Sequence, residues 1–175
     1  DLQQGVCEGN PDVDAIYRLL NPKVNINFKN NKKISLGNSC STFNSQNTIW
    51  FKKIFPLLYL PVSCTMRCTD IWRSIIALRI LQNDNKKILF FGTTMKQFRN
   101  IHNLFIDYNQ EVPMYLQNKN ILNLLKNLKL KKGYKNYSYN LIKSYKYLIR
   151  KKIFPKQELI FLKAWIYDIN KLLKI

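Results

Sequence analysis

Acidic residues, histidine and glycine are scarce in this sequence, and the shortages of histidine and glycine exclude particular kinds of site. The 175 residues include ten Asp or Glu, one His and five Gly. Because His102 stands alone and the C-x3-C pair of Cys64 and Cys68 has no second pair beside it, we expect no structural zinc site. Scarce glycine leaves no Gly-rich phosphate loop, and the sequence also contains no serine-hydrolase elbow, no zinc-protease motif and no established nucleic-acid-reading motif.

Long hydrophobic runs are also missing, which argues against a membrane-spanning segment. The longest apolar run, residues 54–66, is shorter than the roughly 20 residues that a spanning helix needs, and Pro56 and Pro61 interrupt it. The chain does not begin with Met and opens without a leader, so we expect its natural start to lie upstream of Asp1. Its length suits one domain of ordinary size, and its hydrophobic content of 46% is enough for a core.

Positive charge is plentiful and unevenly distributed. Residues 119–175 hold fifteen Lys or Arg against two acids, Glu158 and Asp168, which accounts for +13 of the net charge of +19. Such a basic segment predicts a polyanionic partner, such as a nucleic acid, an anionic lipid or a phosphate-rich ligand. A solvated helical surface in a lysine-biased sequence explains the same pattern equally well.

Four cysteines do not fix the redox compartment of the protein. Cys7, Cys40, Cys64 and Cys68 are expected to be free and buried, and one disulfide is the alternative if the protein is secretory.

Residues 3–20 combine three of the ten carboxylates with a signal for the start of a helix. Asn10 can cap a helix and Pro11 suits its first position, so Asp12 and Asp14 are expected in the first turn. The apolar side chains that should then face a core are Val13, Ala15, Ile16, Leu19 and Leu20. Asp12 and Asp14 would not share a helix face, so we do not expect them to hold one metal ion. A single Asp that points into a cleft suits general-base work, and ordinary helix capping is the alternative.

Short strands are expected between residue 20 and the next helix. Alternation of apolar and polar residues predicts strands at 24–28, 34–36 and 62–66, with a turn at Asn30 and Asn31. The apolar residues 57–60 suit a short buried strand or an irregular core segment.

Helices dominate the remainder of the predicted structure. A buried helix is expected over 71–82, capped by Thr69 or Asp70, and its Asp70 can pair with Arg73. A strand over 88–91 and a helix over 95–109 should follow. Beyond Pro113 we expect helices at about 114–129, 137–151 and 156–174, with a linker at 129–135. The fold class is therefore α/β with short strands, followed by a mainly helical C-terminal region.

Four segments resemble consecutive blocks of the STELLO-type family of glycosyltransferases. They are QQGVCEGNPDVDAIYRL, TFNSQNTIWF, LYLPVSCTMRCTDIWRSIIALRIL and RNIHNLFIDYNQEVPMYL, and they fall in the family order over about residues 3–118. The basic helical tail is not expected to be part of this signature. The resemblance therefore divides the chain into a glycosyltransferase-like α/β region at 1–118 and a basic helical region at 119–175.

This resemblance implies a partial glycosyltransferase A-like, Rossmann-like region that binds a nucleotide sugar, often with Mn²⁺ or Mg²⁺. The acidic metal-binding cluster of the family lies upstream of the QQG block, so the metal ligands are expected before Asp1 and none within this chain. The resemblance also implies a secretory, Golgi-type setting, with any membrane tether upstream of this chain. Family members can act as regulators of other synthases, so it implies a protein partner in a glycan-synthesis complex as an alternative to catalysis.

The candidate site residues follow from this resemblance together with their chemistry. By analogy with other transferases of this fold, Asp12 is the expected catalytic base, and Asp14 would orient the acceptor hydroxyl. Arginines are suited to neutralise a diphosphate leaving group. The full set of substrate-binding candidates is Asn44, Ser45, Gln46, Asn47, Arg67, Asp70, Arg73, Arg99 and His102.

The predicted function is transfer of a hexose or pentose from a nucleotide sugar to a glycan or related acceptor, with this chain as a truncated form. Two other classes of function remain open on the sequence. One is a non-catalytic interaction or regulatory module of a glycan-synthesis complex. The other is a basic nucleic-acid-binding protein that works through residues 119–175.

Overall fold

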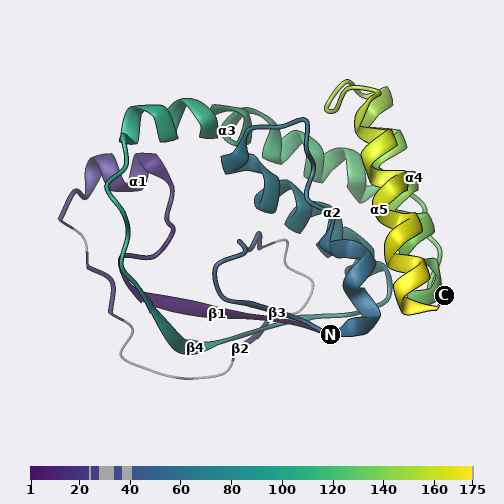
Figure 1. Ribbon diagram of the computed structural model, residues 1–175, viewed down its shortest axis with the longest axis horizontal. Coiled ribbons are helices and arrows are strands. Elements are labelled where there is room, and N and C mark those ends of the chain that lie inside the picture. The colour runs from purple at the N-terminus through teal and green to yellow at the C-terminus, as the bar shows by residue number, and fades with distance from the viewer. Residues whose placement is uncertain (24, 28–33, 37–40, 175) are drawn as a thin grey trace.

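The computed structural model describes residues 1–23, 25–27, 34–36 and 41–174, and it has the mixed α/β fold class that was predicted (Figure 1). Helices α1, α2 and α3 lie on the same side of the sheet, and α4 and α5 lie side by side at one end of the molecule. The strands are β1 (Leu2–Gly9), β2 (Ile34–Leu36), β3 (Thr48–Trp50) and β4 (Ile88–Gln97). The helices are α1 (Ala15–Leu20), α2 (Thr69–Asn83), α3 (Leu104–Lys126), α4 (Tyr137–Arg150) and α5 (Glu158–Leu173).

The sheet has the strand order β2-β4-β1-β3, with β1 and β4 as its central pair. These two strands run parallel, from Leu2 opposite Ile88 to Gly9 opposite Gln97. The outer strands β2 and β3 pair antiparallel with β4 and β1, respectively. Because β1 and β4 are parallel, their carboxyl ends lie together, and the loops that leave these ends meet at one edge of the sheet.

Glycine is required in β1 by the loop that crosses it. Gly5 donates its N–H to the Asn47 carbonyl at 2.8 Å, and a Cβ at Gly5 would come within 2.7 Å of the Phe91 ring and would overlap the Asn47 side chain. At the end of the strand, Gly9 has a φ of +81°, which a side chain would disfavour, and its N–H donates to the Ile26 carbonyl at 2.9 Å. These two positions let the chain pass closely beneath neighbouring backbone.

The first helix begins later than the sequence predicts, so that expectation was wrong. Asn10 is still bonded to the sheet, because its N–H donates to the carbonyl of Gln97 in β4 at 3.0 Å. The helix cap is Asp14, whose Oδ1 accepts the N–H of Tyr17 at 2.9 Å. Of the five apolar side chains expected to face the core, Ala15 alone is buried, and Ile16, Leu19 and Leu20 are exposed.

The strand predicted over residues 88–91 is confirmed but is longer than expected, and the start predicted for the next helix, residue 95, was wrong. β4 continues to Gln97 because it pairs with β1 along most of its length. The next helix, α3, begins at Leu104, where the Asn103 side chain accepts the N–H of Phe105 at 3.1 Å. It then continues through Pro113 to Lys126, so the expected break at that proline is absent.

Residues 52–68 contain two short 3-10 helices, η1 (Lys52–Leu58) and η2 (Met66–Cys68). The irregular alternative for residues 57–60 is therefore confirmed, and the strand expected at 62–66 is wrong. The strand expected at 34–36 is present as β2. Val24, Phe28 and the turn at Asn30 and Asn31 lie outside the described residues. Cys7, Cys64 and Cys68 are free thiols, and Cys40 also lies outside the described part.

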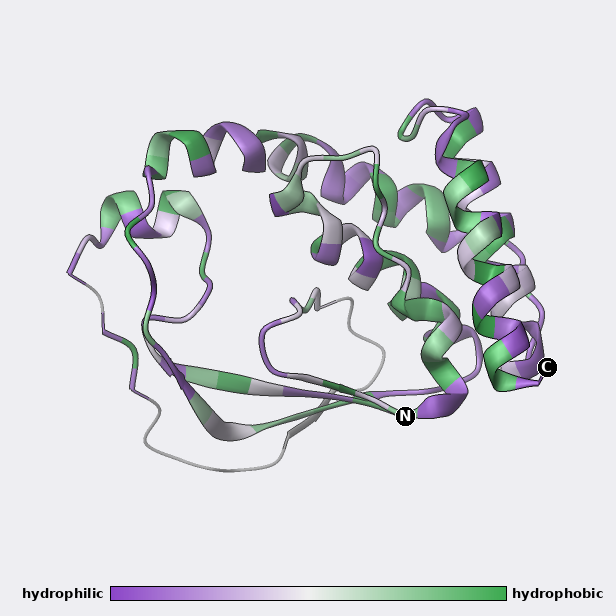
Figure 2. Ribbon diagram, in the orientation of Figure 1, coloured by the Kyte–Doolittle hydropathy of each residue, from purple (hydrophilic) through white to green (hydrophobic). Residues whose placement is uncertain are grey.

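Three helices, α2, α4 and α5, match their predicted positions closely. α2 carries the most buried part of the core, including Ile75, Ala77 and Ile80, and one cluster of buried side chains runs from Leu2 to Ile169. Figure 2 shows hydrophobic and hydrophilic positions mixed along both α4 and α5. No helix in the described part of the chain combines the length and hydrophobicity needed to span a bilayer.

Candidate functional site

A hollow lies at the sheet edge where the loops after β1 and β4 meet. It has a volume of about 240 Å³, and the side chains around it come from both loops, from the loop before β3 and from η2. Ligands of open α/β folds commonly bind outside the carboxyl ends of parallel strands, which is where this hollow lies. Its lining residues are Asn10, Asp12, Gln46, Arg67, Gln97, Phe98, Arg99, Asn100 and His102.

Asp12 is the acid at this hollow, and two arginines hold it. Its Oδ1 lies 3.2 Å from Arg67 Nη1 and 3.1 Å from Arg99 Nη1. Its backbone N–H donates to Gln46 Oε1 at 3.0 Å, and its carbonyl accepts a long contact of 3.5 Å from Asn44 Nδ2. Among the described residues, the ion pairs and hydrogen bonds of the carboxylate involve Oδ1, and 45% of the side chain is exposed. The second oxygen is therefore available to a ligand.

The two arginines are held in turn by a buried acid of α3. Asp107 pairs with Arg67 and, at 2.9 Å, with Arg99 Nη2. The hydrogen bond from Arg67 is the main cause that lowers the pKa of Asp107 below its usual range, and burial opposes this shift only in part. Asp107 is therefore ionised at neutral pH and fixes both guanidinium groups at the hollow.

Glu111 connects α3 to the start of α1. It is buried, and its Oε2 accepts the N–H of Ala15 at 2.7 Å and the hydroxyl of Tyr115 at 2.8 Å. The same hydroxyl lies 3.3 Å from Asp14 Oδ1. Burial and the Glu111 carboxylate raise the pKa of Tyr115 above its ordinary value, so this tyrosine stays protonated. Asp14 thus serves as a helix cap at the rim and is absent from the lining of the hollow.

The loop of Asn44, Ser45, Gln46 and Asn47 divides its contacts between the hollow and the core. Asn44 and Gln46 contact the backbone of Asp12, as described above. Asn47 instead donates to the Val6 carbonyl at 3.1 Å. The structure therefore brings half of this predicted loop to Asp12.

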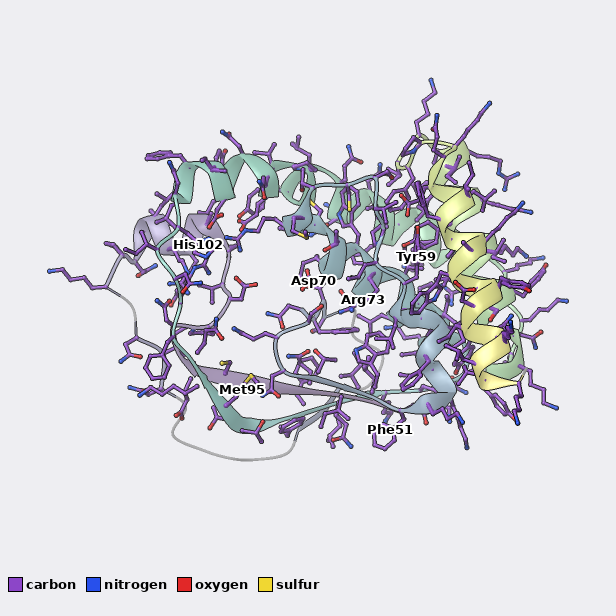
Figure 3. The ribbon with its side chains drawn as sticks, viewed as in Figure 1. Phe51, Tyr59, Asp70, Arg73, Met95 and His102 are labelled. Carbon is purple, nitrogen blue, oxygen red and sulfur yellow. The ribbon has the colours of Figure 1, made fainter. Side chains whose placement is uncertain are left out.

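Ser45 joins Asp70 and Arg73, which were expected to pair directly. Its N–H donates to Asp70 Oδ2 at 2.8 Å, and its hydroxyl accepts from Arg73 Nη2 at 3.0 Å. No direct ion pair between Asp70 and Arg73 is found in the described part of the chain. Figure 3 shows both residues on α2, away from His102.

Arg73 is enclosed in the core and does not line the hollow. Its side chain is 5% exposed, and its guanidinium lies 4.9 Å from the centre of the Trp50 ring and 5.8 Å from that of Phe43. Burial lowers the pKa of Arg73, with the nearby Asp70 acting in the opposite direction. These contacts support the loop from beneath.

A family model for STELLO glycosyltransferases matches residues 67–174. The chain belongs to this family. A search of curated proteins found no match. The STELLO match includes the basic tail, so the expectation that the tail lies outside the family signature was wrong.

Within the STELLO match, Asp107 and Glu111 were not among the site residues predicted from the sequence. The usable signal was weak, because Asp107 was expected near the end of a helix over 95–109, whereas α3 begins at Leu104. Had Asn103 been recognised as the cap of α3, Asp107 and Glu111 would have fallen on one face of its first two turns. Arg67, Arg99 and the exposed acid that they share, Asp12, were identified, but the buried acid that they share, Asp107, was not.

Metal binding is not supported by the donor atoms that meet here. Asp12, Asp107 and Glu111 are each close to a guanidinium group, which competes with a cation for the same oxygens. In the part of the chain that the structure describes, no three His, Cys, Asp or Glu side chains are grouped to hold a metal ion. Metal ligands upstream of Asp1 stay a prediction for this STELLO chain.

Proposed function

We propose that the hollow is the acceptor side of a glycosyltransferase site that uses a nucleotide sugar and transfers a hexose or pentose to a glycan or related acceptor. The observation that carries this proposal is the position of Asp12. Ordinary helix capping explains Asp14, because its side chain accepts the Tyr17 N–H, but it does not explain Asp12. An exposed carboxylate oxygen at the carboxyl end of two parallel strands suits a general base.

The chemistry divides between Asp12 and the two arginines. Asp12 would take the proton of an acceptor hydroxyl while the oxygen of that hydroxyl bonds to the anomeric carbon of the sugar. The bond from that carbon to the diphosphate breaks in the same reaction, and the negative charge passes to the leaving group. Arg67 and Arg99 are oriented by Asp107 and would stabilise this charge, for which a guanidinium is well matched. The Gln46 and Asn100 amides and His102 can hydrogen-bond sugar hydroxyls.

The test is Asp12→Asn in the complete protein, assayed with a panel of nucleoside-diphosphate sugars in the presence of Mn²⁺ or Mg²⁺. Loss of a general base lowers the rate by about 10²- to 10⁴-fold. Asn keeps the size of the side chain, so the circular dichroism spectrum should not change. The matched control is Asp168→Asn, which removes one exposed acid from α5 and should leave the rate unchanged.

Unchanged turnover in Asp12→Asn, with the fold intact, would end the assignment of Asp12 as the base. The rival interpretation, a non-catalytic module of a glycan-synthesis complex, requires that the unmodified complete protein neither transfers nor hydrolyses any nucleotide sugar in the panel.

A further inference from the structure

A groove beside α4 and the start of α5 combines an apolar floor with a rim of positive charge. It has a volume of about 620 Å³. Its cations are Lys143, Lys146, Arg150 and Lys156, and its apolar part includes Ile142 and Ile149. We propose that this groove docks the protein on the headgroups of an anionic lipid bilayer. This proposal goes beyond sugar transfer and is independent of the site at Asp12.

The positive charge of the groove is not neutralised by the protein. Among the described residues, none of the four cations has an ion pair with an acid. α4 contains no Asp or Glu. On α5, Glu158 is fully buried and accepts hydrogen bonds from residues 59–63, so it does not face the groove. Uncompensated cations on one surface are complementary to a polyanion.

Apolar side chains beside these cations favour a bilayer over a nucleic acid. Ile142, Ile149 and Leu159 are half-buried at the groove. Lysine and arginine can lay their hydrocarbon stems on such a surface and keep their charges at phosphate depth. A bilayer interface offers anionic groups above an apolar boundary, whereas a nucleic acid backbone offers charge without one.

The position of the groove is compatible with an open transferase site. α4 and α5 lie at the end of the molecule away from α1, whose preceding loop carries Asp12 (Figure 1). In Figure 3, many nitrogen-tipped side chains at this end extend into solvent. Docking through α4 and α5 would therefore leave the hollow at Asp12 free to receive substrates.

The experiment measures co-sedimentation of the full chain with phosphatidylcholine vesicles and with vesicles that also contain phosphatidylserine. We expect binding to the second kind alone. The variant Lys143→Gln, Lys146→Gln, Arg150→Gln removes three charges from the groove. Each Lys or Arg near an anionic surface contributes about fivefold to partitioning, so this variant should bind on the order of 100-fold more weakly.

The matched control is Lys23→Gln, Lys87→Gln, Lys119→Gln, which removes three charges from exposed positions elsewhere. Because charges beyond about 10 Å from the surface are screened by salt, this control should lose less than about tenfold. Circular dichroism verifies that both variants are folded. Equal losses in the two variants, or no binding to phosphatidylserine vesicles, would overturn the proposal. So would a DNA duplex that binds more tightly than these vesicles and depends on the same three groove residues.

Discussion

Asp107 is the residue on which the geometry of the candidate site depends. Its carboxylate contacts two arginines that come from separate segments, η2 and the loop after β4. His102 Nδ1 lies 3.5 Å from the same carboxylate oxygen, and the exposed edge of its ring lines the hollow. One buried acid thus holds three nitrogen-bearing side chains in place. Without it, Arg67 and Arg99 would share only the half-exposed carboxylate of Asp12 and would repel each other more strongly.

Replacing Asp107 by Asn should destabilise the fold by about 3 kcal/mol near neutral pH, because it removes one partner from a buried charge cluster. The folded-state pKa of Asp107 is lowered, mainly by the Arg67 hydrogen bond, relative to the ordinary value of 3.8. Its stabilising contribution is therefore fully present above about pH 4 and is lost as the pH falls through the lowered folded-state pKa.

Urea denaturation of the natural chain and the variant from about pH 7 to about pH 3 measures this difference. The gap in unfolding free energy should narrow at the acidic end. A gap of constant size would show that Asp107 stabilises the fold by packing and not by charge. Asp168→Asn on the exposed face of α5 serves as the control and should show no comparable gap.

The chemical roles of single residues could be predicted from the sequence more fully than the residues that they contact. Asp12, Gln46, Arg67, Arg99 and His102 were named as candidates, and all five line one hollow. Residue type and local context are enough to suggest such roles. Arg73 has the same chemistry, but the rings of Trp50 and Phe43 enclose it, and this burial depends on contacts that no local pattern encodes.

A buried carboxylate fastens α5 to the rest of the molecule. Glu158, at the first position of the helix, accepts the N–H of Val62 at 3.1 Å and that of Ser63 at 2.9 Å. The hydroxyls of Tyr59 and Ser63 donate to the same carboxylate. Burial and this hydrogen bond raise the pKa of Tyr59 above its ordinary value, so the tyrosine remains a donor. Further along α5, Trp165 Nε1 donates to the Pro56 carbonyl at 3.0 Å.

The substitution Glu158→Gln should weaken this attachment by about 2 kcal/mol, because a carboxamide places an N–H₂ group among donors that need an acceptor. Chemical denaturation measures the loss, and hydrogen exchange should show that the amides of α5 exchange faster than those of α2. Asp168→Asn, also on α5, is the control. If Glu158→Gln were as stable as the control, the carboxylate would be dispensable for docking of the helix.

Helices were predicted better than strands for a physical reason. α4 and α5 have apolar positions at helical spacing, because each of these helices buries one side. α2 is buried on nearly all sides, and its long apolar run also indicates a helix. β1 has no such pattern, since LQQGVCEG is half polar and is stabilised by neighbours on both edges. Separate helices were expected before and after Pro113, at 95–109 and 114–129, but α3 passes through this proline.

The hydrophobic core joins the two regions that the sequence separates at residue 118, a position that lies inside α3. Trp72 of α2 meets Phe154 at 5.5 Å between ring centres, and Tyr59 meets Tyr145 of α4 at 5.4 Å. The segment proposed as a linker is also tied down, since Gly133 donates its N–H to Asp84 Oδ1 at 2.8 Å. These contacts bind the basic helices firmly to the α/β part.

We therefore expect the full chain to unfold in one cooperative transition, with circular dichroism and tryptophan fluorescence changing together. A version that ends at residue 126 should lose this cooperativity, because it exposes the buried faces of α2 and η1. Two separate transitions in the full chain, or a well-folded shortened chain, would contradict this expectation and support independent regions at 1–118 and 119–175.

The parallel pairing of β1 with β4 also constrains how the nascent chain can fold. Leu2 leaves the ribosome well before its partner Ile88, which is synthesised only after α2 is complete. Until then β1 has no partner along the edge that β4 will occupy. The sheet forms only when these distant parts of the chain meet, which is a slow kind of folding step. The growing polypeptide must therefore keep β1 from wrong pairings while the residues between β1 and β4 are still being synthesised.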